Sequence, residues 1–273
     1  MASDTPDSDK PTPRRGTVER RRRLSRFIGE QGSQISLHEL QEEFGISAAT
    51  LRRDLAALSD SGELVRVYGG VAPARRAEST WREKAASFAE SKVKIARFAA
   101  AELIKPGDIV FIDAGTTPAA IARQLAMRED ITVVVAGLAS LLELADGTVT
   151  VVVLGGRFRR RSASFLGQAS DHLLDLISPE GAVLGTDFLD PEMGANFPEL
   201  EQALFKLRVI ARSTQSWFVA DESKLRGSAP FRHWTPILPP TGIVTMAGQG
   251  EQEQASLEAF RRRGCLVHEV DNA

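Results

Sequence analysis

The sequence predicts two domains: a small N-terminal winged helix-turn-helix domain, and a larger α/β domain with a mostly parallel sheet. Its 273 residues are more than one compact domain usually needs. Before residue 60, two short helical patterns flank a tight turn, and a β-prone stretch ending in two glycines follows. Beyond residue 90, apolar strands without polar alternation are interleaved with helical patterns, which is typical of a parallel sheet covered on both faces.

We expect four segments along the chain. Residues 1–16, rich in Pro, Ser and Asp, predict a disordered tail. Residues 17–72 form the winged helix-turn-helix domain. Residues 73–90 predict a partly helical linker, and residues 91–273 form the α/β domain.

Caps and apolar spacing define the N-terminal domain. Residues 17–32 predict a first helix, and Ser36 with Glu39 is a capping box that opens a second helix, which Gly45 ends. Ser47 is the N-cap of a third helix. Each of the three helices has its own apolar face at helical spacing. The residues are Leu24, Phe27 and Ile28 on the first helix, Leu37, Leu40 and Phe44 on the second, and Leu51, Leu55 and Leu58 on the third.

Strand patterns define the wing and the second domain. Residues 64–68 are β-prone and end at Gly69-Gly70, which predicts a hairpin wing. Apolar stretches predict seven further strands at 109–112, 131–135, 149–154, 182–184, 217–220, 243–246 and 266–270. Helical patterns lie at 95–104, from Pro118, and near Leu138, Gln168, Glu199 and Gln252.

Composition and charge exclude several classes of protein. The net charge is −2, and the hydrophobic and charged fractions, 42% and 26%, are those of ordinary cytoplasmic proteins. The single cysteine, Cys265, allows no internal disulfide, and the four histidines lack metal-ligand spacing, so we expect no metal and no cofactor. No apolar run is long enough to cross a bilayer, so we expect a cytoplasmic protein with no membrane partner.

Positive charge is concentrated at the N-terminal end, because the segment from Arg14 to Arg76 contains twelve arginines and eight acidic residues. In a helix-turn-helix motif, the outward-facing N-terminal half of the motif's second helix reaches base edges, and this helix is the third helix of the domain. The candidate DNA-binding residues are Ser47, Thr50, Arg52 and Arg53 on that helix, Arg66 and Tyr68 on the wing, and Arg20 on the first helix. The alternative is a solvated helix face in which Arg52 or Arg53 pairs with Asp54 or a neighbouring acid.

A second candidate site follows the first strand of the α/β domain. Gly115, Thr116 and Thr117 lie between a buried strand and a helix predicted from Pro118, so their amides and hydroxyls converge at the positive end of that helix. The pattern favours an anion site, to which Lys224 could add a charge. A capped turn without a ligand is the alternative.

With its helix-turn-helix pattern and four further motifs, the chain resembles the DeoR family of bacterial transcription regulators from about residue 17 onward. The four motifs occur in the order expected for that family. They are Asp113-Ala114-Gly115-Thr116-Thr117, Leu154-Gly155-Gly156, Gly185-Thr186-Asp187 and Asp221-Glu222-Ser223-Lys224. The resemblance implies a C-terminal domain that is similar in fold to ribose-phosphate isomerases and senses sugar phosphates. Its candidate effector-binding residues are Asp113, Gly115, Thr116, Thr117, Gly155, Gly156, Asp187, Lys206 and Lys224. Asp113 and Asp187 could instead cap loops, and Gln202 and Lys206, which share a helix face, could border the pocket or be solvated.

The sequence departs from the family pattern at several of these motifs. Val135-Ala136 replaces a Thr-Asn pair, Phe188 replaces a glycine, and Leu207 replaces an arginine, while Gln202 stands where an acid is common. We expect these changes to remove polar groups and add bulk near the pocket.

Two functions remain open at this point. The favoured one is a repressor that binds a double-stranded DNA operator as a homodimer or homotetramer and responds to a phosphorylated metabolite. The alternative is a sugar-phosphate isomerase-like enzyme with an accessory DNA-binding module. No catalytic set of Ser/His/Asp or Cys/His type is apparent, so we name no catalytic residue.

Overall fold

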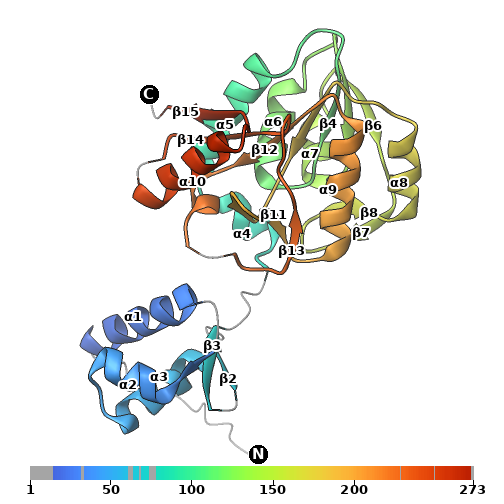
Figure 1. The fold of residues 1–273 in the computed structure, drawn as a ribbon. Helices are drawn as coiled ribbons and strands as arrows, with labels where there is room; N and C mark the ends of the chain where they lie inside the picture. Colours follow the sequence, from blue (N-terminus) through green and yellow to red (C-terminus); the bar gives the residue numbers. More distant parts are fainter. Residues whose placement is uncertain are drawn as a thin grey trace, which may run out of the picture. The chain divides into compact units, whose positions relative to one another are not determined.

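The computed structural model describes residues 15–31, 34–60, 64–67, 69–73, 78–227, 229–248 and 250–271. The chain divides into two compact units, Met1–Arg76 and Ala77–Ala273 (Figure 1). The tail expected at 1–16 lies outside the described residues except for its last two, which already belong to the first helix. Of the linker expected at 73–90, residues 78–90 lie in the second unit and contain a helix of their own.

The first unit is a winged helix-turn-helix. Its elements are α1 (Arg15–Gln31), β1 (Ile35–Ser36), α2 (Leu37–Phe44), α3 (Ala48–Asp60), β2 (Leu64–Val67) and β3 (Gly70–Pro73). The capping box of Ser36 and Glu39 is present, and Gly45 ends α2 in the left-handed conformation. The wing is a three-stranded sheet in the order β1-β3-β2. Leucines of α1, α2 and α3 pack with Ile28, Ile35 and Val71 in one small core.

The second unit is built on a seven-stranded, entirely parallel sheet in the order β15-β14-β12-β9-β4-β5-β6. Its strands are β4 (Ile109–Ile112), β5 (Thr132–Val135), β6 (Thr150–Val153), β9 (Gly181–Leu184), β12 (Gln215–Ala220), β14 (Gly242–Met246) and β15 (Val267–Val270). These are the seven strands predicted from the apolar stretches. The predicted fold class is therefore confirmed. The strand order reverses between β4 and β9, which makes their carboxyl ends the place where such sheets bind ligands.

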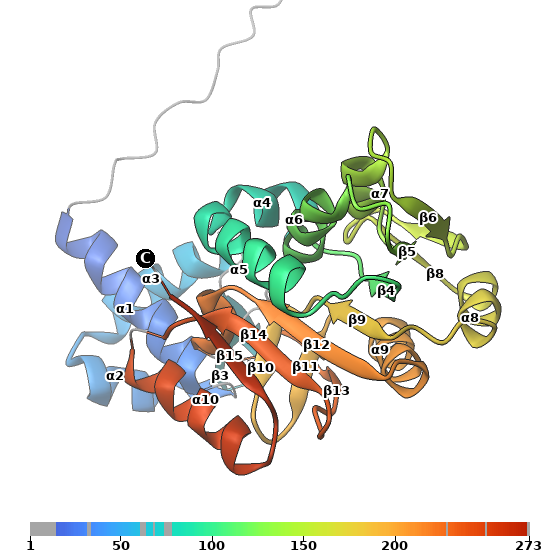
Figure 2. The same ribbon diagram turned by 90° about the horizontal axis from the view of Figure 1, so that it is seen from above.

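Helices cover both faces of this sheet (Figures 1 and 2). They are α4 (Trp81–Ala86), α5 (Ala89–Glu102), α6 (Thr116–Leu125), α7 (Leu138–Leu144), α8 (Gln168–Asp175), α9 (Leu200–Arg212) and α10 (Glu251–Arg262), with the 3-10 helix η1 (Glu222–Leu225) after β12. Side chains of α5, α6 and α7 join one buried cluster, and those of α8, α9 and α10 join another on the opposite face. Strands buried from both sides are why the sequence shows continuous apolar runs.

Five short strands among the described residues of the second unit were not predicted. They are β7 (Arg157–Arg159), β8 (Ser164–Leu166), β10 (Phe188–Asp190), β11 (Gly194–Phe197) and β13 (His233–Thr235). β7 and β8 form a hairpin, and the other three form a small antiparallel sheet. Unlike the strands of the parallel sheet, these short strands contain no continuous apolar run that would identify them in the sequence.

Candidate effector and DNA-binding sites

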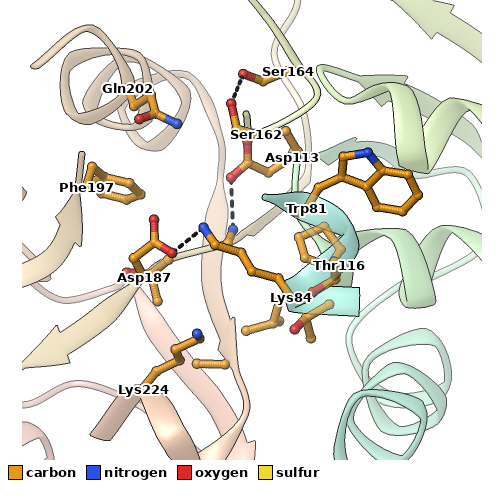
Figure 3. Close-up of a pocket in the computed structure, with 18 of the residues that line it drawn as sticks. Trp81, Lys84, Asp113, Thr116, Ser162, Ser164, Asp187, Phe197, Gln202 and Lys224 are labelled. Carbon is orange, nitrogen blue, oxygen red and sulfur yellow. Dashed lines mark hydrogen bonds and ion pairs between the residues drawn. The ribbon is translucent and has the colours of Figure 1, made fainter. Parts of the chain in front are cut away.

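A pocket lies at the carboxyl ends of the three neighbouring strands β4, β9 and β12. Asp113 follows β4, Gly185 to Asp187 follow β9, and Asp221 follows β12, and all of them line the pocket. Figure 3 shows Gln202 and Phe197 on one side of it and Trp81 and Thr116 on the other. The sheet topology therefore brings together three of the four motifs singled out in the sequence.

The N-terminus of α6 forms one wall of the pocket. Gly115 is the N-cap, with φ 139°, and α6 begins at Thr116, two residues earlier than the predicted start at Pro118. The first amides of a helix have no intrahelical acceptor, so those of Thr116 and Thr117 are available to a ligand. Pro118 has no N–H and occupies a position where none is needed. This wall can bind an anion.

Asp113 and Asp221 are the most buried charged groups of the pocket, each with 1% of its surface exposed. Asp113 Oδ1 accepts a hydrogen bond from Lys206 Nζ at 2.7 Å, and its Oδ2 accepts one from the amide of Gly185 at 2.9 Å. A Cβ on Gly185 would lie 3.0 Å from the carbonyl oxygen of Ala114, so the close approach of the two loops favours glycine there. Both carboxylate oxygens are therefore engaged within the protein, and Asp113 with Lys206 stabilises the loop framework.

Helix α4 covers part of the pocket and contributes Trp81 and Lys84 to it. Lys84 Nζ lies 2.5 Å from Asp187 Oδ1, an ion pair that joins α4 to the loop after β9 (Figure 3). Thr80 caps α4 in a capping box with Glu83. The amide of Trp81 donates to the carbonyl oxygen of Arg161. The segment that the sequence suggested was a linker thus supplies a wall of the pocket from residue 78 onward.

Lys92, on α5, anchors the end of α4. Its ammonium group donates to the carbonyl oxygens of Lys84 and Ser87, and lies 3.9 Å from Asp221 Oδ2. Burial lowers the pKa of Lys92, although the charge of Asp221 opposes this shift. Asp221 in turn accepts hydrogen bonds from the backbone and the hydroxyl of Ser223. Lys92 was not singled out in the sequence, because nothing local distinguishes it from a solvated helix lysine.

A second buried ion pair anchors the segment just before α4. Arg159 donates two hydrogen bonds to the carboxylate of Glu78 and one to Ser162, which lines the pocket. Burial lowers the pKa of Arg159, but hydrogen bonds to Glu78 and Glu199 raise it by more, so the guanidinium remains charged. Glu78 is the first described residue of the second unit.

Three further predicted effector residues have different surroundings. Lys224 lines the pocket, and its ammonium group makes no ion pair with the residues that the structure describes. Gly155 and Gly156 do not line it. They form the turn after β6, where the carbonyl oxygen of Gly155 accepts from Ser170, and a Cβ on Gly156 would meet the carbonyl oxygen of Leu166 at 2.6 Å. Their conformation explains the glycines without a ligand.

The expected effect of the departures from the family pattern was mostly wrong. Val135 and Ala136 are buried in the core on opposite faces of the sheet, and Phe188 and Leu207 are also absent from the pocket wall. Only Gln202 lines the pocket. The polar character of the pocket is therefore retained. Four lysines and three aspartates surround it, namely Lys84, Lys92, Lys206, Lys224, Asp113, Asp187 and Asp221.

In the first unit, α3 presents two arginines to solvent. Arg52 and Arg53 are exposed and make no ion pair with the described residues, while Leu51 and Leu55 on the same helix are buried. Ser47 precedes α3 and its hydroxyl accepts from the amide of Thr50. The suggested pairing of either arginine with Asp54 is not formed. The N-terminal half of α3 is consequently free to contact another molecule.

The other predicted DNA contacts have different surroundings. Arg20 Nε lies 2.7 Å from Asp54 Oδ2, and Arg21 Nε lies 2.8 Å from Asp54 Oδ1, so one buried aspartate holds two arginines of α1. Arg66 is exposed on β2. Tyr68 lies outside the described residues. Arg20 therefore helps to fix α1 on α3, and its contact with DNA stays a prediction.

A DNA-reading module joined to a parallel α/β unit with a charged pocket defines a ligand-responsive transcription regulator. The chain matches the model of the DeoR-like helix-turn-helix domain over residues 20–76 and that of the DeoR C terminal sensor domain over residues 87–245. It belongs to the DeoR family of transcription regulators.

Curated relatives match most of the chain. It is 32% identical over 210 residues to the HTH-type transcriptional regulator GlpR of Haloferax volcanii, covering 76% of this chain and 82% of that protein. It is 29% identical over 215 residues to the glycerol-3-phosphate regulon repressor of Escherichia coli K12, covering 78% and 84%. Among solved structures, ribose 5-phosphate isomerase A of Methanocaldococcus jannaschii is similar at 17% identity and a TM-score of 0.38, covering 50% of this chain and 55% of that one.

Two further kinds of feature are absent from the described residues. No helix among them has the length and apolarity that crossing a membrane requires. No cluster of three or more histidine, cysteine or carboxylate side chains suited to a metal ion occurs within them.

Proposed function

We propose that this regulator is a repressor whose operator binding is modulated by a small phosphorylated metabolite, a sugar or polyol phosphate, bound in the pocket of the second unit. The observation that carries the proposal is the N-terminus of α6. There, the first helical amides and the hydroxyls of Thr116 and Thr117 line the pocket, and Lys224 contributes an ammonium group to the same pocket. The name of the glycerol-3-phosphate regulon repressor, a relative, is in keeping with an effector of this class.

The charges of the pocket also support an anionic effector. The four lysines exceed the three aspartates by one positive charge. Lys206 is neutralised by Asp113, and Lys84 by Asp187, whereas Lys224 has no carboxylate partner among the described residues. A phosphate group at the α6 end would supply that partner, in the manner expected of a lysine that acts as a point charge.

The effector half of the proposal is tested by calorimetry with phosphorylated sugars and polyols, their dephosphorylated forms, and inorganic phosphate. Thr116→Val and Lys224→Met should each weaken binding of the phosphorylated compounds about tenfold, because each removes a contact to a charged group. Lys105→Met, which alters an exposed lysine that does not line the pocket, is the matched control. Equal binding of phosphorylated and dephosphorylated forms would refute a phosphate-anchored site.

The part of the proposal that concerns DNA binding rests on Arg52 and Arg53. Replacing both with Ala should weaken specific operator binding about thirtyfold or more without unfolding the first unit, because removing one arginine from a base edge costs roughly 1–3 kcal/mol and neither side chain is buried. Arg232→Ala, an exposed arginine of the second unit, is the control. Wild-type affinity should also fall steeply with salt. A folded double variant that retains operator affinity would contradict the assignment.

For the coupling between effector and operator, we infer that α4 is the moving element. Its Lys84 reaches across the pocket to Asp187, so an anion that attracts Lys84 competes with this ion pair. Helix α4 is also the first helix of the second unit in the sequence. Lys84→Met should therefore preserve operator binding and reduce its response to effector. The measurement is operator affinity with and without a saturating phosphorylated ligand, and an undiminished response would exclude α4.

We further propose that the protein acts as a homodimer or homotetramer. One winged helix buries a modest interface, so useful operator specificity requires at least two copies on one DNA. Light scattering should give a mass of two or four chains at micromolar concentration. A monomer both free and on operator DNA would refute this.

A further inference from the structure

We propose that Gln202 selects the uncharged end of the effector by accepting a hydrogen bond from one of its hydroxyl groups. This assignment rests on the proposed function, because it takes the phosphate to bind at the N-terminus of α6. It adds a specificity-determining residue at the other side of the same pocket, and it restricts the effector to phosphorylated compounds that carry a hydroxyl at that side.

The first observation is an unpartnered acceptor. Gln202 lies on α9 with 7% of its surface exposed, and it lines the pocket. Its Oε1 is buried and accepts no hydrogen bond from the described residues. A buried acceptor without a donor is unfavourable, so proteins supply such groups with a partner. Figure 3 shows the Gln202 side chain at the edge of the pocket, on the side opposite Trp81 and Thr116.

The second observation distinguishes Gln202 from other buried polar side chains that lack a hydrogen-bond partner. Ser216, Glu222 and Thr245 also carry buried side-chain oxygens without a partner among the described residues, but none of these three residues lines the pocket. Among these four side chains, Gln202 alone combines an unmet hydrogen bond with a place in the pocket wall.

The charges near Gln202 decide which chemical group of a ligand can donate a hydrogen bond to its Oε1. Gln202 is four residues before Lys206 on α9, so both side chains lie on one face of the helix, and Lys206 is already paired with Asp113. A ligand ammonium group would add a second positive charge beside Lys206, whose carboxylate partner is already engaged. A ligand carboxylate has no proton to donate to Oε1. A hydroxyl is the remaining common donor, and it leaves the charge balance of the pocket unchanged.

The test compares ligands with and without hydroxyl groups. Calorimetry would measure binding of inorganic phosphate, glycerol 3-phosphate, ribose 5-phosphate and fructose 1-phosphate to wild-type protein, to Gln202→Met and to the exposed control Gln168→Met. At least one polyol or sugar phosphate should bind wild type more tightly than inorganic phosphate does. Gln202→Met should weaken that ligand about tenfold while changing the affinity for inorganic phosphate less than twofold. Gln168→Met should change neither.

Thermal unfolding without ligand provides an independent readout. Methionine has the length of glutamine and no amide, so Gln202→Met removes the orphan oxygen and should leave the melting temperature unchanged or raise it. A purely structural role for Gln202 would instead lower the melting temperature of the variant, and that result would overturn the assignment.

The outcomes distinguish this assignment from the proposal on which it rests. If a sugar phosphate binds wild type but Gln202→Met weakens it no more than inorganic phosphate, Gln202 does not select the ligand and the phosphate site stands. If no phosphorylated probe binds wild type, the phosphate site is refuted, and the role of Gln202 is refuted with it.

Discussion

The two units of the chain hold their functional arginines and lysines in opposite ways. In the first unit, Arg52 and Arg53 extend into solvent, while the neighbouring Asp54 is occupied by two arginines from another helix. In the second unit, Lys84 and Lys206 are each paired with an aspartate inside the pocket. A surface that reads DNA can leave its cations solvated, whereas a pocket must balance the charges it buries.

The comparison also separates two uses of a buried aspartate. Asp54 and Asp113 are both 1% exposed. The partners of Asp54 are partly open to solvent, with side chains 28% and 30% exposed, whereas Lys206, the partner of Asp113, is 5% exposed. Removing Lys206 leaves the Asp113 carboxylate buried, whereas removing Asp54 leaves two arginines that are partly open to solvent, so the change in the pocket should cost more.

The largest expected effect is that of Lys206→Met. This change leaves the Asp113 carboxylate buried with the Gly185 amide as its remaining donor among the described residues, and it should destabilise the second unit by about 3–5 kcal/mol. All three tryptophans, Trp81, Trp217 and Trp234, lie in this unit, so tryptophan fluorescence during urea unfolding is the measurement. Lys224→Met, at a lysine without an ion pair among the described residues, should change stability by less than about 0.5 kcal/mol. Equal stability of both variants would mean that Asp113 does not need its cation.

Asp54→Ala should have the next largest effect, about 2 kcal/mol, confined to the first unit. The destabilisation is smaller because Arg20 and Arg21 can turn toward water once their partner is removed. Hydrogen exchange of the α1 and α3 amides in the full chain would detect it, with tryptophan fluorescence unchanged. Asp60→Ala, at an exposed residue, is the control. If Asp54→Ala also moved the tryptophan transition, the two units would not unfold independently.

Each unit has one helix opened by a capping box with a hydroxyl cap, Ser36 for α2 and Thr80 for α4. Ser36→Ala and Thr80→Ala should each cost about 1 kcal/mol, because each removes the acceptor for the third helical amide. Hydrogen exchange of the α2 amides should report the first change and that of the α4 amides the second. Weaker protection at both helices in either single variant would contradict local capping.

The smallest expected effect is a shared acid sensitivity of these two caps. Hydrogen bonds from the backbone and hydroxyl of Ser36 lower the pKa of Glu39 below 4.5, and those of Thr80 do the same for Glu83. A carboxylate whose pKa is lower in the folded state stabilises the fold above its unfolded pKa, and this contribution is lost as the pH falls through the folded value. Protection of α2 and α4 should therefore decline below pH 4.5. In Glu39→Gln, protection of α2 should be insensitive to pH in this range while α4 still responds.

Much of this molecule is determined by local sequence. The helices of the first unit, the capping box at Ser36, the seven parallel strands and the turn at Gly115 that leads into a helix were all predicted, because apolar period and cap residues act over a few neighbours. The exposure of Arg52 and Arg53 also followed from the opposite, leucine-bearing face of α3. The short strands and the start of α6 were missed, since three residues carry almost no periodic signal.

Only the tertiary structure decided which charges meet. Lys84 comes from a segment whose composition suggested a linker, yet it pairs with Asp187, 103 residues away, and Lys206 pairs with Asp113 across 93 residues. Arg20, predicted to contact DNA, is held by Asp54 on another helix. Val135 and Ala136, expected at the pocket, are in the core, while the Oε1 of Gln202 is left without a partner among the described residues. Such pairings depend on strand order and helix packing, which position side chains to within the few ångströms of a hydrogen bond, and local periodicity carries no information at that distance.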